Sequence, residues 1–234
     1  RCGSNMLLSC LKKHTQVICY NEIFNNRILW GYNKLDNKNL KNEKSLLELR
    51  NKYPILFLDK FIFPVRLDGL SALGFKLFYY QLENNHLNKV WNYIFEQKNI
   101  KIIRLYRENI LKQITSYRIA QNTQVWIGSQ QNADSHVALD VNYCSNIFEK
   151  WSRYYERYSE CLSAHDILHV SYENLSTSTQ YVLNEIQSFL NLDVQHLVPS
   201  TVKQRKKELS KVLTNYDELR NHFKDTRWER FFVA

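Results

Sequence analysis

The sequence predicts an α/β domain in which a parallel sheet is covered by helices on both faces. Short apolar runs alternate along the chain with longer segments in which apolar residues recur every three or four positions. Hydrophobic residues make up 44% of the 234 residues and aromatic residues 14%, which is enough to fill a core and excludes a disordered chain. No linker rich in proline, glycine or serine interrupts the sequence, so we expect one domain over residues 1–234.

The elements of the first half are predicted in order from these patterns. Helical spacing of apolar residues covers 6–13, and a β-like run follows over 16–20. Residues 33–52 are rich in Asn, Lys and Glu, and the leucines in their second half predict a surface helix. The aromatic run GFKLFYY at 74–80 starts at a glycine and predicts a buried strand, and a helix is predicted over 87–97.

The second half repeats the alternation. KIIRLY at 101–106 predicts a strand, and helical periodicity resumes over 110–120. A broad apolar and aromatic face predicts a long helix over 145–162. ILHVS at 167–171 predicts the next strand, and a helix is predicted over 177–190.

The charge and the cysteines limit the partners and the compartment. A formal net charge of +9 favours an anionic partner, namely a nucleotide, a nucleic acid or an acidic membrane surface, although solubility alone also explains it. The five cysteines are odd in number and form no CxxC pair, so we expect a reducing compartment and assign the protein to the cytoplasm. No apolar run reaches the roughly 20 residues of a transmembrane segment. No signal peptide is visible, but the abrupt start at Arg1 leaves open that a segment before it is missing.

The opening RCGSNM has the layout of a phosphate-binding loop, a tight turn before a helix. The backbone N–H groups of Gly3, Ser4, Asn5 and Met6 can point at one oxyanion there, and Arg1 can add a planar fork of donors. The loop lacks the Gly-Lys-Ser/Thr ending of nucleoside triphosphatases, which disfavours a nucleotide kinase. The alternative is that Ser4 is an ordinary helix N-cap without a ligand.

A second anion-binding element follows the strand predicted over 101–106. Arg107 stands where that strand ends, at the edge where open α/β sheets bind ligands, and Ser116 lies nine residues later on the next helix. Together they can hold a second phosphate. The alternative makes Arg107 a solvated strand end and Ser116 a helix-surface residue.

These stretches resemble those of sulfotransferases that use 3′-phosphoadenosine 5′-phosphosulfate (PAPS). RCGSNMLLSCL is similar to the family's 5′-phosphosulfate loop, and RENILKQITSYRIAQNTQVW to its 3′-phosphate motif. The second likeness is greatest to the bacterial trehalose sulfotransferase type and covers Arg107, Gln113, Ser116, Ala120 and Trp126. GFKLFYYQ, HVSYENLSTSTQYVLNEIQSFLNL and TNYDEL also resemble family stretches, so the likeness spans nearly the whole chain.

The resemblance implies a P-loop-like three-layer sandwich whose central parallel sheet is flanked by helices. It also implies a PAPS-binding site, with Tyr172 beside the adenine and Gln204 in a late loop that closes over the 3′-phosphate. A packed strand-end tyrosine and a solvated charge run are the alternatives for these two positions. The PAPS-binding residues that it implies are Arg1, Gly3, Ser4, Asn5, Met6, Arg107, Ser116, Tyr172 and Gln204.

Two features depart from the family pattern. Cys2 replaces the usual hydroxyl residue, which removes one donor from the loop. The strand that should lead into the loop is absent, so either it lies outside the printed sequence or the sheet lacks its central strand.

Transfer of a sulfuryl group requires a base for the acceptor hydroxyl, and Glu22 is the candidate. The resemblance matches Glu22-Ile23-Phe24 to the segment that carries the base in the trehalose sulfotransferase type, without its flanking glycine and proline. A loop carboxylate with no role is the alternative, and His14 is the second candidate for the base. No histidine spacing indicates a metal, so no metal is expected.

The predicted function is transfer of the sulfuryl group from PAPS to a hydroxyl acceptor, a carbohydrate, a glycolipid or a small metabolite. One rival is a catalytically inactive relative that binds nucleotides or polyanions. The other is a basic nucleic-acid-binding protein, which the dispersed basic residues and the lack of an RNP or zinc motif disfavour. The acceptor and the oligomeric state are not encoded in any motif.

Overall fold

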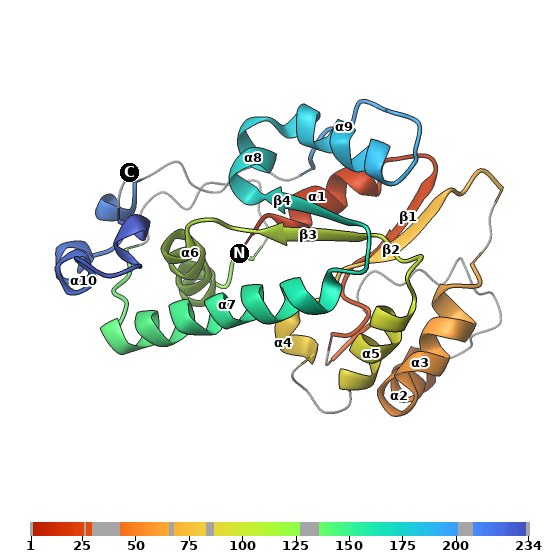
Figure 1. The fold of residues 1–234 in the computed structure, drawn as a ribbon, viewed down its shortest axis with the longest axis horizontal. Helices are drawn as coiled ribbons and strands as arrows, with labels where there is room; N and C mark the ends of the chain where they lie inside the picture. Colours follow the sequence, from red (N-terminus) through yellow and green to blue (C-terminus); the bar gives the residue numbers. More distant parts are fainter. Residues whose placement is uncertain are drawn as a thin grey trace.

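The computed structural model describes residues 2–25, 27–29, 43–65, 68–82, 87–126, 136–200 and 208–232. Seventeen helices and strands lie in these ranges (Figure 1). The strands are β1 (Val17–Tyr20), β2 (Ala72–Phe75), β3 (Ile102–Tyr106) and β4 (Ile167–Ser171). The α-helices are α1 (Ser4–Leu11), α2 (Glu43–Lys52), α3 (Pro54–Phe57), α4 (Tyr79–Leu82), α5 (Asn88–Glu96), α6 (Ile110–Thr123), α7 (Val141–Leu162), α8 (Tyr172–Thr177), α9 (Thr179–Phe189) and α10 (Tyr216–His222). The π-helical segment η2 (Leu58–Ile62) and the 3₁₀ turns η3 (Leu209–Lys211) and η4 (Glu229–Phe231) complete the set.

The strands of the described ranges form two parallel pairs. β1 pairs with β2, and β3 pairs with β4, in each case along the whole length of both strands. Helices lie in the connection within each pair, as parallel neighbours require. The predicted α/β class with parallel strands is therefore confirmed.

Helices cover the strands from both sides, which gives three layers (Figure 1). On one side α1, α8 and α9 bury Leu11, Leu175 and Ile186 in a cluster that includes Val170 of β4. On the other side Tyr158 and its neighbours on α7 pack with α5 and with the first residues of β3 and β4. Helices on both faces explain why these strands read as short apolar runs rather than as alternating patterns.

The strand predicted over 74–80 is wrong in its boundaries. β2 ends at Phe75, and residues 79–82 form α4 instead. The ring of Tyr79 stacks on that of Tyr158 with centroids 4.5 Å apart, and Trp91 stacks on the same tyrosine at 4.9 Å. Packing against α7 and α5 therefore overrides the β propensity of this aromatic run.

The remaining predicted helices overlap helices of the structure, whereas α3 with η2, α8, α10 and the short turns η3 and η4 were not predicted. α8 follows β4 directly because Ser171 caps it, accepting a hydrogen bond from the N–H of Asn174 at 3.1 Å. Pro54 begins α3, which continues into η2. Among the described helices none is both long and apolar enough to span a membrane.

Candidate functional site

The loop before α1 is built around Gly3. Its φ of 80° lies in the left-handed region, and a Cβ placed there would lie 2.6 Å from Cδ2 of Tyr172. Ser4 is the first helical residue and Gly3 the N-cap, so the alternative that Ser4 is an ordinary N-cap is wrong. The first N–H groups of a helix have no partner within it, and the N-cap Gly3 has no side chain that could accept from them, so these groups can donate to an anion.

Lys76 lies against this loop and joins it to Glu22. Its Nζ is 2.7 Å from Oε1 of Glu22, and it donates to Oδ1 of Asn5 at 3.1 Å and to Oγ of Ser4 at 3.5 Å. The side chains of Lys76 and Glu22 are only 10% and 9% exposed. A carboxylate and an ammonium group are thus held together at the N-terminus of α1.

Arg50 of α2 holds the backbone of the segment that follows Glu22. The guanidinium of Arg50 is buried and donates to the carbonyl oxygens of Ile23 at 2.7 Å and of Asn25 at 2.8 Å. Burial lowers the pKa of Arg50 to about 10. Asn25 in turn donates from Nδ2 to Oε2 of Glu22 at 3.2 Å, so the carboxylate and its loop are held on two sides.

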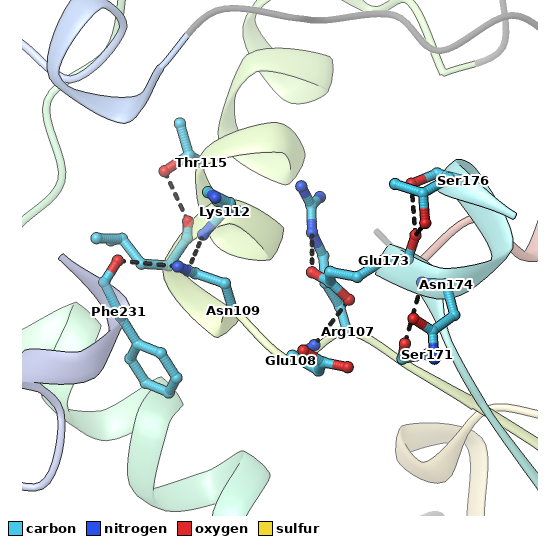
Figure 2. Close-up of polar contacts among 12 residues, drawn as sticks. Arg107, Glu108, Asn109, Lys112, Thr115, Ser171, Glu173, Asn174, Ser176 and Phe231 are labelled. Carbon is cyan, nitrogen blue, oxygen red and sulfur yellow. Dashed lines mark hydrogen bonds and ion pairs between the residues drawn. The ribbon is translucent and has the colours of Figure 1, made fainter. Parts of the chain in front are cut away.

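Arg107 forms the second cationic position, at the end of β3 (Figure 2). Its Nε lies 3.7 Å from Oε1 of Glu173, and the N–H of Glu108 donates to the other oxygen of that carboxylate at 3.1 Å. Burial lowers the pKa of Arg107 below its ordinary value, while the nearby Tyr172 and Glu173 act in the opposite direction. The side chain is 14% exposed, so the guanidinium is largely removed from water without being fully enclosed.

Tyr172 connects the two positions. The guanidinium of Arg107 lies 4.6 Å from the centroid of the Tyr172 ring. The edge of the same ring lies next to Gly3, where a Cβ would otherwise be placed. The loop before α1 and Arg107 therefore both lie beside one aromatic ring.

The N-terminal residues of α1, Glu22, Lys76, Arg107 and Tyr172 line one cavity of about 1890 Å³. Of the proposed donor-binding residues and the first candidate for the base, it brings together the eight that lie in described ranges. They are Gly3, Ser4, Asn5, Met6, Glu22, Arg107, Ser116 and Tyr172. Cys2 lines the cavity too, whereas Arg1 and the loop residues Lys203, Gln204 and Arg205 lie outside the described residues.

His14, the second candidate for the base, lies in a different environment. It is 3% exposed, its Nε2 donates to the carbonyl of Asp193 at 2.8 Å, and its Nδ1 accepts from the N–H of Gln16 at 3.1 Å. Both ring nitrogens are engaged by the backbone, and the ring is not among the groups that line the cavity. These contacts make His14 a structural residue that ties the end of α1 to the segment after α9.

The model of the sulfotransferase domain matches residues 1–232. The chain belongs to the sulfotransferase domain family. It is 26% identical over 139 residues to Nodulation protein H of Rhizobium tropici, a match that covers 58% of this chain and 55% of that protein. Nodulation protein H of Rhizobium meliloti is 23% identical over 138 residues, which are 57% of this chain and 56% of that protein. The chain thus spans about half the length of the curated relatives it matches.

A solved structure is also similar to this sulfotransferase domain. The crystal structure of a sulfotransferase from Alicyclobacillus acidocaldarius superposes with a TM-score of 0.49 at 12% identity, over 95% of this chain and 87% of that one.

Two residues that hold the candidate site together were missed in the sequence. Lys76 stands inside GFKLFYY, and a lone lysine in an aromatic run predicted as a buried strand was the available signal, because a buried lysine needs a partner. Arg50 gave no such signal, since it falls among charged residues of a predicted surface helix. Within the described ranges no group of three or more His, Cys, Asp or Glu side chains is arranged to hold a metal ion.

Proposed function

We propose that this chain transfers a sulfuryl group from PAPS to the hydroxyl group of an acceptor. The observation that carries the proposal is that two candidate anion-binding positions, the N-terminus of α1 and Arg107, line one cavity and both lie beside Tyr172. A donor with a phosphosulfate at one end and a 3′-phosphate at the other needs two such positions. Membership in the sulfotransferase family supports the same reaction.

The residues fit such a donor. The N-terminus of α1, with Gly3, Ser4, Asn5 and Met6, suits the 5′-phosphosulfate, because backbone N–H groups and the helix dipole favour an anion there. Arg107 and Ser116 suit the 3′-phosphate, and the ring of Tyr172 suits the adenine. We retain Arg1 and Gln204 as further donor-binding residues on the strength of the resemblance.

Glu22 is the proposed general base. Its carboxylate receives the proton of the acceptor hydroxyl, so that the acceptor oxygen can form its bond to sulfur. The donor supplies the sulfuryl group and leaves as 3′-phosphoadenosine 5′-phosphate. Lys76, 2.7 Å from Glu22 and in contact with Ser4 and Asn5, supplies positive charge where negative charge develops on the transferred group.

We also propose a compartment and an acceptor class for this protein. All five cysteines are free thiols, which supports a reducing compartment such as the cytoplasm. The acceptor class is a carbohydrate, a glycolipid or a small metabolite.

Binding of 3′-phosphoadenosine 5′-phosphate tests the donor site. At a concentration about 100 times its Kd, the nucleotide should stabilise the parent by about 2.7 kcal/mol, which raises Tm by roughly 5–10 °C. Arg107→Ala should weaken binding by about tenfold or more because a charge-assisted contact is lost, and Ser116→Ala should weaken it less. Arg227→Ala is the control, since this exposed arginine pairs with Glu149 outside the cavity. A parent that is not stabilised would show the donor assignment to be wrong.

Turnover tests the base. Glu22→Gln should keep nucleotide binding and reduce transfer of labelled sulfate by about 100-fold or more. Lys76→Gln should also reduce transfer, because the carboxylate of Glu22 would lose its ion pair. If Glu22→Gln keeps normal turnover, another group is the base. If the parent binds the nucleotide but transfers sulfate to no glycan or metabolite, the chain is the inactive relative.

A further inference from the structure

Arg104 of β3 is a buried arginine that the proposed mechanism does not use. It is 8% exposed and lies on a strand that helices cover from both sides (Figure 1). Removing a guanidinium from water is costly unless hydrogen bonds replace those to the solvent. Arg104 makes such bonds to α7, because its Nη2 donates to the carbonyl oxygen of Tyr155 at 3.0 Å and its Nη1 donates to Oγ of Ser159 at 2.6 Å. The cation is thus anchored to α7 by groups that carry no charge.

The side chain of Tyr155 contacts three residues at the end of β3. The guanidinium of Arg104 lies 5.0 Å from the centroid of its ring. The ring of Tyr106 meets it edge to face, with centroids 6.0 Å apart at an angle of 79°. Burial raises the pKa of the Tyr155 phenol above its ordinary value, and the hydrogen bond that its oxygen accepts from the backbone N–H of Arg107 opposes this rise. One residue of α7 therefore holds Arg104, Tyr106 and Arg107.

The contact with Arg107 lies where the pairing of β3 with β4 ends. The last paired residue of β3 is Tyr106, so Arg107 stands just beyond the strand. There the N–H of Arg107 donates to Tyr155 of α7, and the next N–H, that of Glu108, donates to Glu173 of α8 at 3.1 Å. Side chains of two different helices thus fix the main chain that carries the Arg107 guanidinium. A guanidinium binds a phosphate through a planar fork, so its direction matters as well as its charge.

We propose that Tyr155 is a positioning residue for Arg107 and that Arg104 holds Tyr155 in place. This inference rests on the proposed sulfuryl transfer, since it takes Arg107 as the residue that binds the 3′-phosphate of the donor. The phenol oxygen of Tyr155 fixes the main chain at Arg107, so that the guanidinium meets the phosphate without rearranging. Arg104 fixes Tyr155 in turn, through its carbonyl oxygen and through its ring. Tyr155 therefore contributes to the selectivity of the site for nucleotides that carry a 3′-phosphate.

Two nucleotides that differ only in the 3′-phosphate test the inference on the full chain. Calorimetry measures the selectivity, which is the Kd of adenosine 5′-phosphate divided by the Kd of 3′-phosphoadenosine 5′-phosphate. Tyr155→Phe keeps the ring and removes the phenol oxygen, so the selectivity should fall about fivefold while the Kd of adenosine 5′-phosphate changes less than about twofold. Arg104→Lys keeps the charge but loses the planar fork, and it should lower the selectivity in the same direction. Tyr216→Phe is the matched control, because the hydroxyl of Tyr216 donates to the carbonyl of Phe232 at 2.7 Å and neither residue lines the cavity.

The Arg107→Ala background tests whether Tyr155 acts through Arg107. There Tyr155→Phe should change the selectivity less than about twofold, because the guanidinium to be positioned is gone. If the selectivity falls as far as it does in the parent, or if Tyr155→Phe weakens both nucleotides equally, Tyr155 does not act through Arg107 and the inference is overturned. Unchanged selectivity in Tyr155→Phe and Arg104→Lys also overturns it, while the donor site stands if the parent binds 3′-phosphoadenosine 5′-phosphate. If the parent does not bind that nucleotide, the proposed function itself fails.

Discussion

Replacing Gly3 by alanine should destabilise the protein in two separable ways. Gly3 has a φ of 80°, and so does Gly69, but only Gly3 has a neighbour where a Cβ would be placed. At Gly69 no atom of the described residues lies within 4 Å of the added Cβ, whereas at Gly3 the new Cβ would lie 2.6 Å from Cδ2 of Tyr172. Gly69→Ala therefore measures the cost of the left-handed backbone alone, and Gly3→Ala adds a clash.

The expected magnitudes follow from these geometries. A non-glycine residue in the left-handed region costs about 1–2 kcal/mol, so Gly69→Ala should lower the free energy of unfolding by about that amount. Overpacking adds about 1–3 kcal/mol, so Gly3→Ala should lower it by about 2–5 kcal/mol. Urea denaturation of the parent and of both variants measures the difference.

Removing the neighbour should remove the excess. In a Tyr172→Ala background, Gly3→Ala should cost no more than Gly69→Ala does in the parent, because Leu175 at 3.8 Å remains at ordinary contact distance. Equal losses for the two glycine variants in the parent would refute the reasoning, since Tyr172 would then move aside freely.

Two further predictions concern buried groups away from the donor. Arg50→Met should lower the free energy of unfolding by about 2–4 kcal/mol, because the carbonyl oxygens of Ile23 and Asn25 lose their buried hydrogen-bond donor. Urea denaturation measures this change. A loss below about 1 kcal/mol would show that other groups donate to these carbonyls in place of Arg50. Burial raises the pKa of the Cys19 thiol to about 11 and of the Cys144 thiol to about 12 from an ordinary 9.0. In the unfolded chain these thiols ionise at a lower pH than in the folded protein. The free energy of unfolding should therefore fall as the pH rises from about 8 to about 10, and replacing both cysteines by alanine should reduce that slope. If the slope is unchanged, other groups cause the loss of stability at alkaline pH.

The fold class and most elements could be predicted because their patterns are local. β1, β3 and β4 and the long helices α6 and α7 follow from apolar runs and helical periodicity. The end of β2 could not be predicted, because the run GFKLFYY has strand propensity throughout. Only packing against α7 and α5 explains why Tyr79 begins a helix.

The parts of the candidate site that belong to a local sequence motif could be predicted. The parts that depend on contacts between residues far apart in the sequence could not. Gly3–Met6 and Arg107 stand at a loop and at a strand end, positions where α/β folds bind anions. Lys76 and Glu22 are 54 residues apart in the sequence, and their ion pair exists because β1 and β2 are parallel neighbours that end at the same edge. Arg50 likewise donates a hydrogen bond to the carbonyl of Ile23, which lies far from it in the sequence, and no local pattern predicts that contact.

The two strand pairs also affect how this chain behaves in solution. In the described ranges β2 is paired only with β1, and β3 only with β4, while both β2 and β3 line the same cavity. An edge with one neighbour presents a row of backbone donors and acceptors to any extended peptide that reaches it.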